Sequence, residues 1–162
     1  MAVIPNWRRI SCVLTNNNAQ LPLGGIMRGG AICNQSGALS LFGCGISNNA
    51  ATSWNLPISE WFGYGGAIYN ANGVVQIVGC NCSGNSCHSI GGLVGNPGGS
   101  AMGGGVFQAS GALLVTNSTF TLNQALASVD LMPGYGGALC ATGGVVIIDH
   151  SQFAGNTSAG GG

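Results

Sequence analysis

Hydrophobic residues and glycines recur along the chain in one fixed order. Each copy begins with Gly-Gly and has another glycine eight positions after its start. Two apolar residues follow, separated from each other by a single residue. It closes with an asparagine 20 positions after its start. The copies begin at Gly29, Gly65, Gly103 and Gly136, and residues 14–17 match the end of a further, partial copy. Successive copies begin 36, 38 and 33 residues apart, a period typical of solenoids and other repeat proteins.

Each copy predicts short β-strands. In the first copy Leu39 and Leu41 alternate with Ser40, which is the two-residue period of a strand with one buried face. One more apolar run follows the paired glycines and another precedes the closing asparagine, whereas glycine, at 31 of 162 residues, disfavours helices. Three short strands cannot bury an apolar face alone, but stacked copies cover one another. We therefore expect an all-β solenoid, a parallel β-helix of about five turns with three short strands per turn.

The repeats organise the chain into a single β-helix domain, residues 1–162, a length that fits one domain. The segments between each closing asparagine and the next Gly-Gly vary in length and content, so we expect them to be loops. The expected repeats, the first of them partial, are about 1–28, 29–64, 65–102, 103–135 and 136–162.

Stacking would place equivalent residues of successive copies about 4.8 Å apart, in columns. One apolar column is expected to face inward: Ile32, Ile68, Val106 and Leu139. A second column would contain the closing asparagines: Asn17, Asn49, Asn85, Asn123 and Asn156. Asparagine tolerates the left-handed backbone of a corner, and its amide can bond the amides above and below it. We expect a structural asparagine ladder, with ordinary turn asparagines as the alternative.

The repeat also resembles those of a known family. The Gly-Gly-Ala-Ile/Leu starts, together with Phe-x-x-Asn at 120–123 and 153–156, resemble the repeats of chlamydial polymorphic outer-membrane proteins and related right-handed β-helix surface proteins. Ile46 and Cys82 depart from the motif, because they stand where the aromatic residue belongs. The resemblance extends from about Leu14 onward. The resemblance implies a right-handed β-helix and a structural or adhesive role at a cell surface. It implies no catalytic residue.

Charge is unusually scarce in this chain. Charged residues make up 4% of the sequence and the formal net charge is zero. With three arginines as the only cations besides histidine, nucleic-acid binding is not expected. Few charges and many apolar residues make a lone monomer poorly soluble, so we expect partner copies, glycans or more chain to cover the surface. No apolar run approaches the length of a membrane-spanning helix.

The seven cysteines indicate an oxidising compartment, and hence an extracellular or cell-surface location. Three of them occupy one repeat position and would form a column: Cys12, Cys44 and Cys80. Neighbours in such a column have a Cα spacing compatible with a disulfide, so we expect Cys44 to be bonded to Cys12 or to Cys80. Cys82 and Cys87 could close a small local loop. A metal site within residues 80–88 is the alternative, but its spacing matches no common zinc pattern, and we expect no metal and no cofactor.

Two features are candidates for contact with sugars. Asn-x-Ser/Thr sequons make Asn34, Asn81 and Asn117 candidates for glycosylation, whereas Asn156 belongs to the inward asparagine column. The loop after the first full copy carries an aromatic group that could stack on a sugar or contact a subunit: Trp54, Trp61, Phe62 and Tyr64. A loop that folds back over the side of the solenoid is the alternative.

The acids do not suggest an enzyme. Polysaccharide lyases and hydrolases built on β-helices need clustered carboxylates, often with calcium and a basic residue. Here Glu60, Asp130 and Asp149 fall in different repeats at positions that do not stack, and so do His88 and His150. We expect a non-catalytic, extracellular structural or adhesive solenoid. The alternatives are a carbohydrate-binding module and, less favoured, a polysaccharide-degrading enzyme.

The two ends of the sequence suggest assembly. Residues 160–162 start a copy. If a second chain followed them directly, its Asn17 would lie 19 positions after Gly160, compared with 20 positions between the start and the closing asparagine of every full copy. We therefore expect copies to stack head to tail into a filament, because contacts between different ends of identical subunits propagate without closing. The rival interpretation is a segment of one longer solenoid.

Overall fold

The computed structural model describes residues 11–21, 25–54, 62–90, 99–127 and 133–159. Within them every regular element is a β-strand, and no helix is present. The strands form five sheets, and every strand pair is parallel. The expected all-β parallel solenoid is thus confirmed.

We call the five sheets A to E. Sheet A contains β1 (Val13–Thr15), β6 (Gly45–Ser47), β11 (Asn81–Ser83), β16 (Thr119–Thr121) and β21 (Gln152–Ala154). Sheet B contains β2 (Asn18–Leu21), β7 (Ala50–Trp54), β12 (Ser86–Ile90), β17 (Gln124–Ala127) and β22 (Thr157–Ser158). Sheet C contains β3 (Ile26–Arg28), β8 (Phe62–Tyr64), β13 (Ala101–Met102) and β18 (Gly134–Tyr135). Sheet D contains β4 (Ile32–Asn34), β9 (Ile68–Asn70), β14 (Val106–Gln108) and β19 (Leu139–Ala141). Sheet E contains β5 (Ala38–Phe42), β10 (Val74–Val78), β15 (Ala112–Thr116) and β20 (Val145–Asp149).

The expectation of three strands per turn was wrong, because each of the three repeats between residues 29 and 135 contributes one strand to each of five sheets. The sheets that the sequence did not predict are B and C. Their inward positions hold mainly small residues in place of large apolar ones, such as Ala51 and Ala125 in sheet B and Gly63 and Ala101 in sheet C. Without alternating large apolar side chains, these strands lack the pattern by which a half-buried strand is found.

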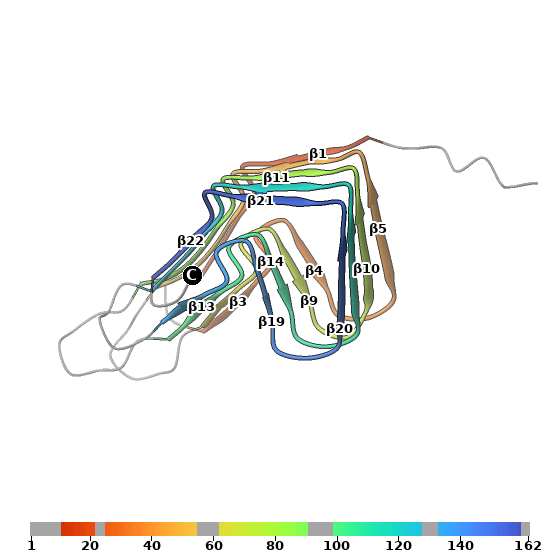
Figure 1. Cartoon of the computed structure of the whole chain (residues 1–162). Helices are drawn as coiled ribbons and strands as arrows, with labels where there is room; N and C mark the ends of the chain where they lie inside the picture. Colours follow the sequence, from red (N-terminus) through yellow and green to blue (C-terminus); the bar gives the residue numbers. More distant parts are fainter. Residues whose placement is uncertain (1–10, 22–24, 55–61, 91–98, 128–132, 160–162) are drawn as a thin grey trace, which may run out of the picture.

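The solenoid has a broad part and a narrow arm in cross-section (Figure 1). Sheets A, D and E enclose the broad part, whose core is made of the inward side chains of every repeat, such as Ile46, Ile68 and Ile77. The inward column of sheet D has the expected register, with Ile32, Ile68, Val106 and Leu139 as successive partners. Sheets B and C form the narrow arm. Between them lies a small second cluster of buried residues, namely Cys87, Ala101 and Ala125.

The paired glycines sit where sheet C turns into sheet D. Gly65 has a left-handed φ of 66°, which glycine adopts without the clash that a Cβ atom causes. At Gly66 the requirement is space, since a Cβ there would collide with the carbonyl oxygen of Gly104 and lie 2.5 Å from the carbonyl carbon of Ser86. The second glycine therefore lets the backbone of this corner pass directly against the start of sheet B.

Replacing Gly66 by alanine should destabilise the protein by more than about 3 kcal/mol, because backbone atoms on two sides cannot move aside as a side chain could. Gly45→Ala is the matched control, since a Cβ at Gly45 meets nothing within 4 Å. Urea unfolding of both variants measures the difference. Equal stabilities would show that the corner does not depend on this close approach.

Candidate functional site

The closing asparagines form a continuous hydrogen-bonded ladder along the solenoid. Each side-chain oxygen accepts from the backbone N–H and from the side-chain amide of the asparagine one repeat earlier. Between Asn85 and Asn123, for example, these distances are 3.0 and 2.9 Å. The second amide hydrogen bonds a carbonyl in sheet A, as from Asn85 to Ile46 at 2.9 Å. The three inner members of the ladder are fully buried: Asn49, Asn85 and Asn123.

This ladder has a direction and two different ends. Donors point from each repeat toward the next one along the chain, so Asn17 Oδ1 has no donor among the described residues. At the other end, Asn156 accepts from Asn123 and donates to the Phe120 carbonyl, and its backbone N–H has no described acceptor. One end of the solenoid thus presents an asparagine acceptor, and the opposite end presents asparagine donors.

Removing one inner asparagine should be costly. Asn85→Ala leaves the N–H of Asn49 and one hydrogen of its side-chain amide without an acceptor in a buried corner, and it removes one donor to the Ile46 carbonyl, so we expect a loss of at least about 3 kcal/mol. Asn17→Ala is the control: Asn17 is exposed at the end of the ladder, and its loss should cost under about 1 kcal/mol. Chemical denaturation of both variants tests the comparison, and a cost for Asn85→Ala no larger than that of the control would contradict it.

The cysteine column is a second ladder, and two serines continue it. Cys44 N–H donates to Cys80 Sγ at 3.3 Å, Cys80 N–H to Ser118 Oγ at 3.1 Å, and Ser118 N–H to Ser151 Oγ at 3.1 Å. Each of these thiols and hydroxyls in turn donates to the carbonyl two residues before it, over distances from 2.9 to 3.6 Å. The position therefore needs a small side chain that both donates and accepts, which serine and cysteine provide. The two serines are found by counting 15 positions from each repeat start, and the sequence analysis missed them.

The two residue types should therefore be interchangeable at Cys80. Cys80→Ser keeps an acceptor for the N–H of Cys44, so its stability should stay within about 1 kcal/mol of the parent. Cys80→Ala is close in volume to Cys80→Ser but leaves that buried N–H unpaired, which should cost about 1–3 kcal/mol more. Thermal and urea unfolding of the two variants distinguish these outcomes. Equal losses would mean that packing alone decides this position.

The structure records all seven cysteines as free. Cys82 lies in the core of the broad part and Cys87 in the narrow arm, so the local loop considered for this pair is not formed. Burial raises the pKa of both thiols, that of Cys87 to about 12, and so keeps them protonated at neutral pH. They act here as small apolar residues.

A third ladder of side-chain amides follows sheet D. Asn34 Nδ2 donates to Asn70 Oδ1 at 2.9 Å, and Asn70 Nδ2 donates to Gln108 Oε1 at 2.7 Å. Asn70 and Gln108 are fully buried. These residues lie five positions after each repeat start, and in the last repeat the position is Ala141.

The three sequons differ in their surroundings. Asn34 is half-buried and its amide is engaged in the sheet D ladder. Asn81 is exposed on β11, and its side-chain oxygen accepts from the Thr119 hydroxyl at 3.2 Å. Asn117 is exposed in the turn between β15 and β16, with a φ of 49°. Exposure therefore favours Asn117 and Asn81 over Asn34 as positions for a glycan.

The aromatic group considered as a sugar or subunit contact is described only in part. Trp61 and the side chain of Trp54 lie outside the described residues, whereas Phe62 and Tyr64 belong to β8. The rings of Phe62 and Tyr64 stack with centroids 5.9 Å apart and planes 5° apart. Both side chains are half-buried.

This pair continues into a cluster that joins sheets C and D. The Tyr64 centroid lies 4.6 Å from that of Phe107 and 6.1 Å from that of Tyr69, and Arg28 lies over the Tyr69 ring at 5.5 Å. Tyr69 and Phe107 stack on each other and are buried. The rings mainly cover one another, which identifies a packing cluster and leaves little ring face for a sugar.

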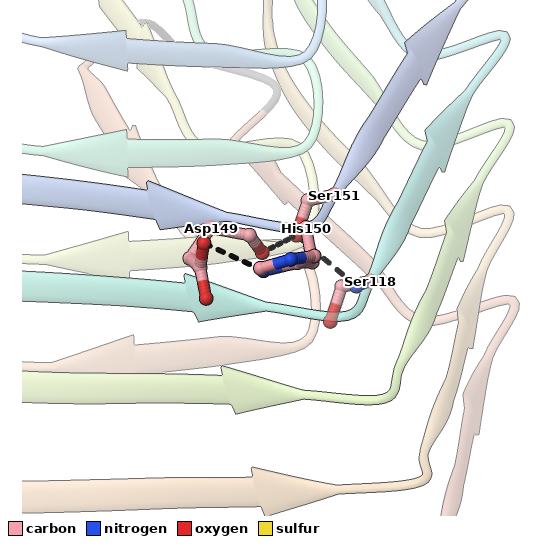
Figure 2. A network of polar contacts seen from close by, with 4 residues as sticks. All are labelled: Ser118, Asp149, His150 and Ser151. Atoms are coloured by element: carbon pink, nitrogen blue, oxygen red, sulfur yellow. Dashed lines mark hydrogen bonds and ion pairs between the residues drawn. The ribbon is translucent and has the colours of Figure 1, made fainter.

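Asp149 and His150 form an exposed acid–base pair. Figure 2 shows His150 beside Asp149, with Nδ1 2.7 Å from Oδ1, and Ser151 and Ser118 in the adjacent ladder. The hydrogen bond to Asp149 raises the pKa of His150. The hydroxyl of Ser118 donates to the carbonyls of Thr116 and Ile77, so it is engaged in the fold. Both members of the pair are more than half exposed, and this arrangement does not form an activated nucleophile.

Among the other titratable candidates, only His88 falls within the described residues. Glu60 and Asp130 lie outside the described residues. His88 lies on β12, where burial lowers its pKa, and its Nε2 is buried without a hydrogen-bond partner. In the part of the chain that the structure describes, no three His, Cys, Asp or Glu residues are placed to hold a metal ion, and no helix could span a membrane.

The C-terminal end of the solenoid exposes its core. Phe153 is 41% exposed although its partner in the preceding repeat, Phe120, is fully buried and stacks on it with centroids 4.9 Å apart. Ile148 is likewise 47% exposed, against 0% for its partner Val115. These two side chains line an open hollow of about 480 Å³, together with residues 136–139, Gly155, Asn156 and Ser158. Comparisons of the chain with protein-family models, with curated proteins and with solved structures found no match.

Proposed function

We propose that the protein is a non-catalytic, extracellular structural or adhesive solenoid whose copies stack head to tail. The proposal includes a right-handed parallel β-helix of about five turns. Connections between neighbouring parallel strands of one sheet are right-handed in nearly all proteins, which supports that sense. A composition rich in cysteine supports the extracellular location, because such chains are typical of oxidising compartments.

The observation that carries the proposal is the difference between the two ends of the asparagine ladder. The C-terminal end offers the N–H and an amide hydrogen of Asn156, and the N-terminal end offers the oxygen of Asn17. A second copy placed in line would continue the pattern of every internal repeat. A copy placed in the opposite sense would bring donors against donors.

The apolar surface at the C-terminal end supports the same partner. Inside the solenoid, the side chain beyond each inward residue of sheet A is the equivalent residue of the next repeat. Beyond Phe153 the next equivalent residue would be Leu14 of a second copy, which is already packed on one side against its own core. Stacking would bury Phe153 and pair the open edge of β21 with that of β1, which removes both apolar exposure and unpaired backbone groups.

The proposal assigns no catalytic role to Asp149 and His150. The pair is exposed at a turn beside the hydroxyl ladder. A general acid or base works on a substrate held within hydrogen-bonding reach, which a flat exposed turn does not provide.

Stacking is tested by placing a charge at the end of the solenoid. Phe153→Arg should abolish concentration-dependent assembly, because the cation would have to be buried against the next copy. Val74→Arg is the matched control: Val74 is also 41% exposed but lies on the side of the solenoid, on β10. Sedimentation velocity and electron microscopy should show rods for the parent and for Val74→Arg, and single subunits for Phe153→Arg.

Two results would overturn this proposal. One is a parent protein of 16.0 kDa that remains monomeric at high concentration. The other is equal loss of assembly in both arginine variants, which would point to side-by-side association. Denatured mass separates stacked subunits from one longer covalent solenoid, and circular dichroism confirms that each variant is folded.

A further inference from the structure

Cys12 makes a different contact from the other members of its column. In the later repeats a backbone N–H reaches the sulfur or oxygen of the next side chain. Between the first two cysteines the sulfurs themselves meet, with Cys12 Sγ donating to Cys44 Sγ at 2.7 Å. A disulfide bond is about 2.05 Å long, so closing this pair requires only a small shift of the side chains.

The alternative pairing, Cys44 with Cys80, would disturb bonds that already exist. Cys80 Sγ accepts from the N–H of Cys44 and donates to the carbonyls of Leu41 and Val78, both at 3.4 Å. Its oxidation would remove the S–H donor from two carbonyls inside the core. At Cys12 the thiol hydrogen is directed to Cys44 itself, so oxidation of this pair replaces that contact by a covalent bond. Among the described residues, the only donor to a carbonyl that it removes is the long contact from Cys44 Sγ to the Phe42 carbonyl at 3.6 Å, which the alternative pairing would remove as well.

We propose that Cys12 and Cys44 are a modification site, oxidised to a disulfide that joins the first repeat to the second. The fold supports this pairing: Thr15 and Leu14 are in register with Ser47 and Ile46, and the Gly45 N–H donates to the Cys12 carbonyl at 2.9 Å. Adjacent positions of neighbouring parallel strands have the Cα spacing that a disulfide needs.

The oxidant is a low-molecular-weight disulfide, such as glutathione disulfide. Cys12 is partly accessible and Cys44 is 3% exposed, so Cys12 reacts first. Its thiolate attacks one sulfur of the small disulfide, forming a mixed disulfide and releasing one small thiol. Cys44 then loses its proton, and its sulfur attacks Cys12 Sγ and displaces the second small thiolate, which takes up a proton. Two protein thiols are oxidised and one small disulfide is reduced to two thiols.

The neighbouring thiol controls the rate of the first step. The hydrogen bond to Cys44, and then burial, raise the pKa of Cys12 to about 11. The thiolate is the attacking species, so oxidation should accelerate as the pH rises toward that value.

The bond would fix an end of the solenoid. β1 pairs with β6 on one side only, and Val13 at its start is 75% exposed. A covalent link between residues 32 positions apart would keep the first repeat, with Asn17, seated on the second. This inference does not depend on stacking, because it concerns bonds within one chain.

The test uses the whole chain and three serine variants, which the natural serines at 118 and 151 suggest will fold. The parent, Cys12→Ser, Cys44→Ser and the control Cys80→Ser are incubated with glutathione disulfide, alkylated, and mapped by non-reducing peptide mass spectrometry. The parent and Cys80→Ser should yield a Cys12–Cys44 linked peptide and lose about 2 Da on oxidation. Hydrogen exchange of residues 13–21 should slow on oxidation in these two proteins and stay unchanged in Cys12→Ser and Cys44→Ser.

Two outcomes would overturn the proposal. One is a linked peptide that joins Cys44 to Cys80, and the other is full alkylation of Cys12 and Cys44 after prolonged oxidation. A linked Cys12–Cys44 peptide without slower exchange would support the modification site and overturn its role in fixing the first repeat.

Discussion

The fold depends on satisfying buried polar groups along the solenoid axis. A corner of a stacked structure turns backbone N–H groups away from the sheet ladders, and an unpaired group buried there costs about 1–3 kcal/mol. Asn85 and its equivalents solve this at the corner between sheets A and B, and Cys80 and Ser118 solve it at the corner between sheets E and A. The Asn85 side chain accepts from the preceding repeat and donates to the next. The Cys80 and Ser118 side chains accept a backbone N–H of the preceding repeat and donate to carbonyls of that repeat and of their own. In both cases a side chain of one repeat supplies the acceptor that the repeat before it needs.

The two parts of the cross-section are held by different forces. The broad part buries large apolar side chains such as Phe120 and Leu113, whose removal from water supplies most of the driving force for folding. The narrow arm buries Cys87, Ala101 and Ala125, which contribute less area but allow two sheets to approach closely. Sheets B and C can therefore lie close together only because the side chains between them are small. At Gly63, for example, a Cβ atom would lie 2.7 Å from Cys87 Sγ.

Period and register were predictable from the sequence because they depend on residues that recur. Ile32, Ile68 and Val106 stand at one offset and share a column in the structure. The narrow arm was not predictable in the same way, since its alanines, serines and glycines show no periodic contrast between apolar and polar positions. The column of Cys44 and Cys80 was found, but its chemistry was not, because a disulfide pair and a hydrogen-bonding column have the same spacing. Ser118 and Ser151 show that the position can serve as a hydrogen-bonding column alone, since hydroxyls form no disulfide.

Length variation in this chain is confined to one place. The distance from each Gly-Gly start to its closing asparagine is always 20 residues, while the distance from Asn17, Asn49, Asn85 and Asn123 to the next start is 12, 16, 18 and 13 residues. That variable stretch includes the strands of sheets B and C, which form the narrow arm (Figure 1). Insertions there leave every ladder and the broad core untouched. The architecture thus separates a part that must stay constant from a part that is free to diverge, so new segments could be displayed at regular intervals without a new fold.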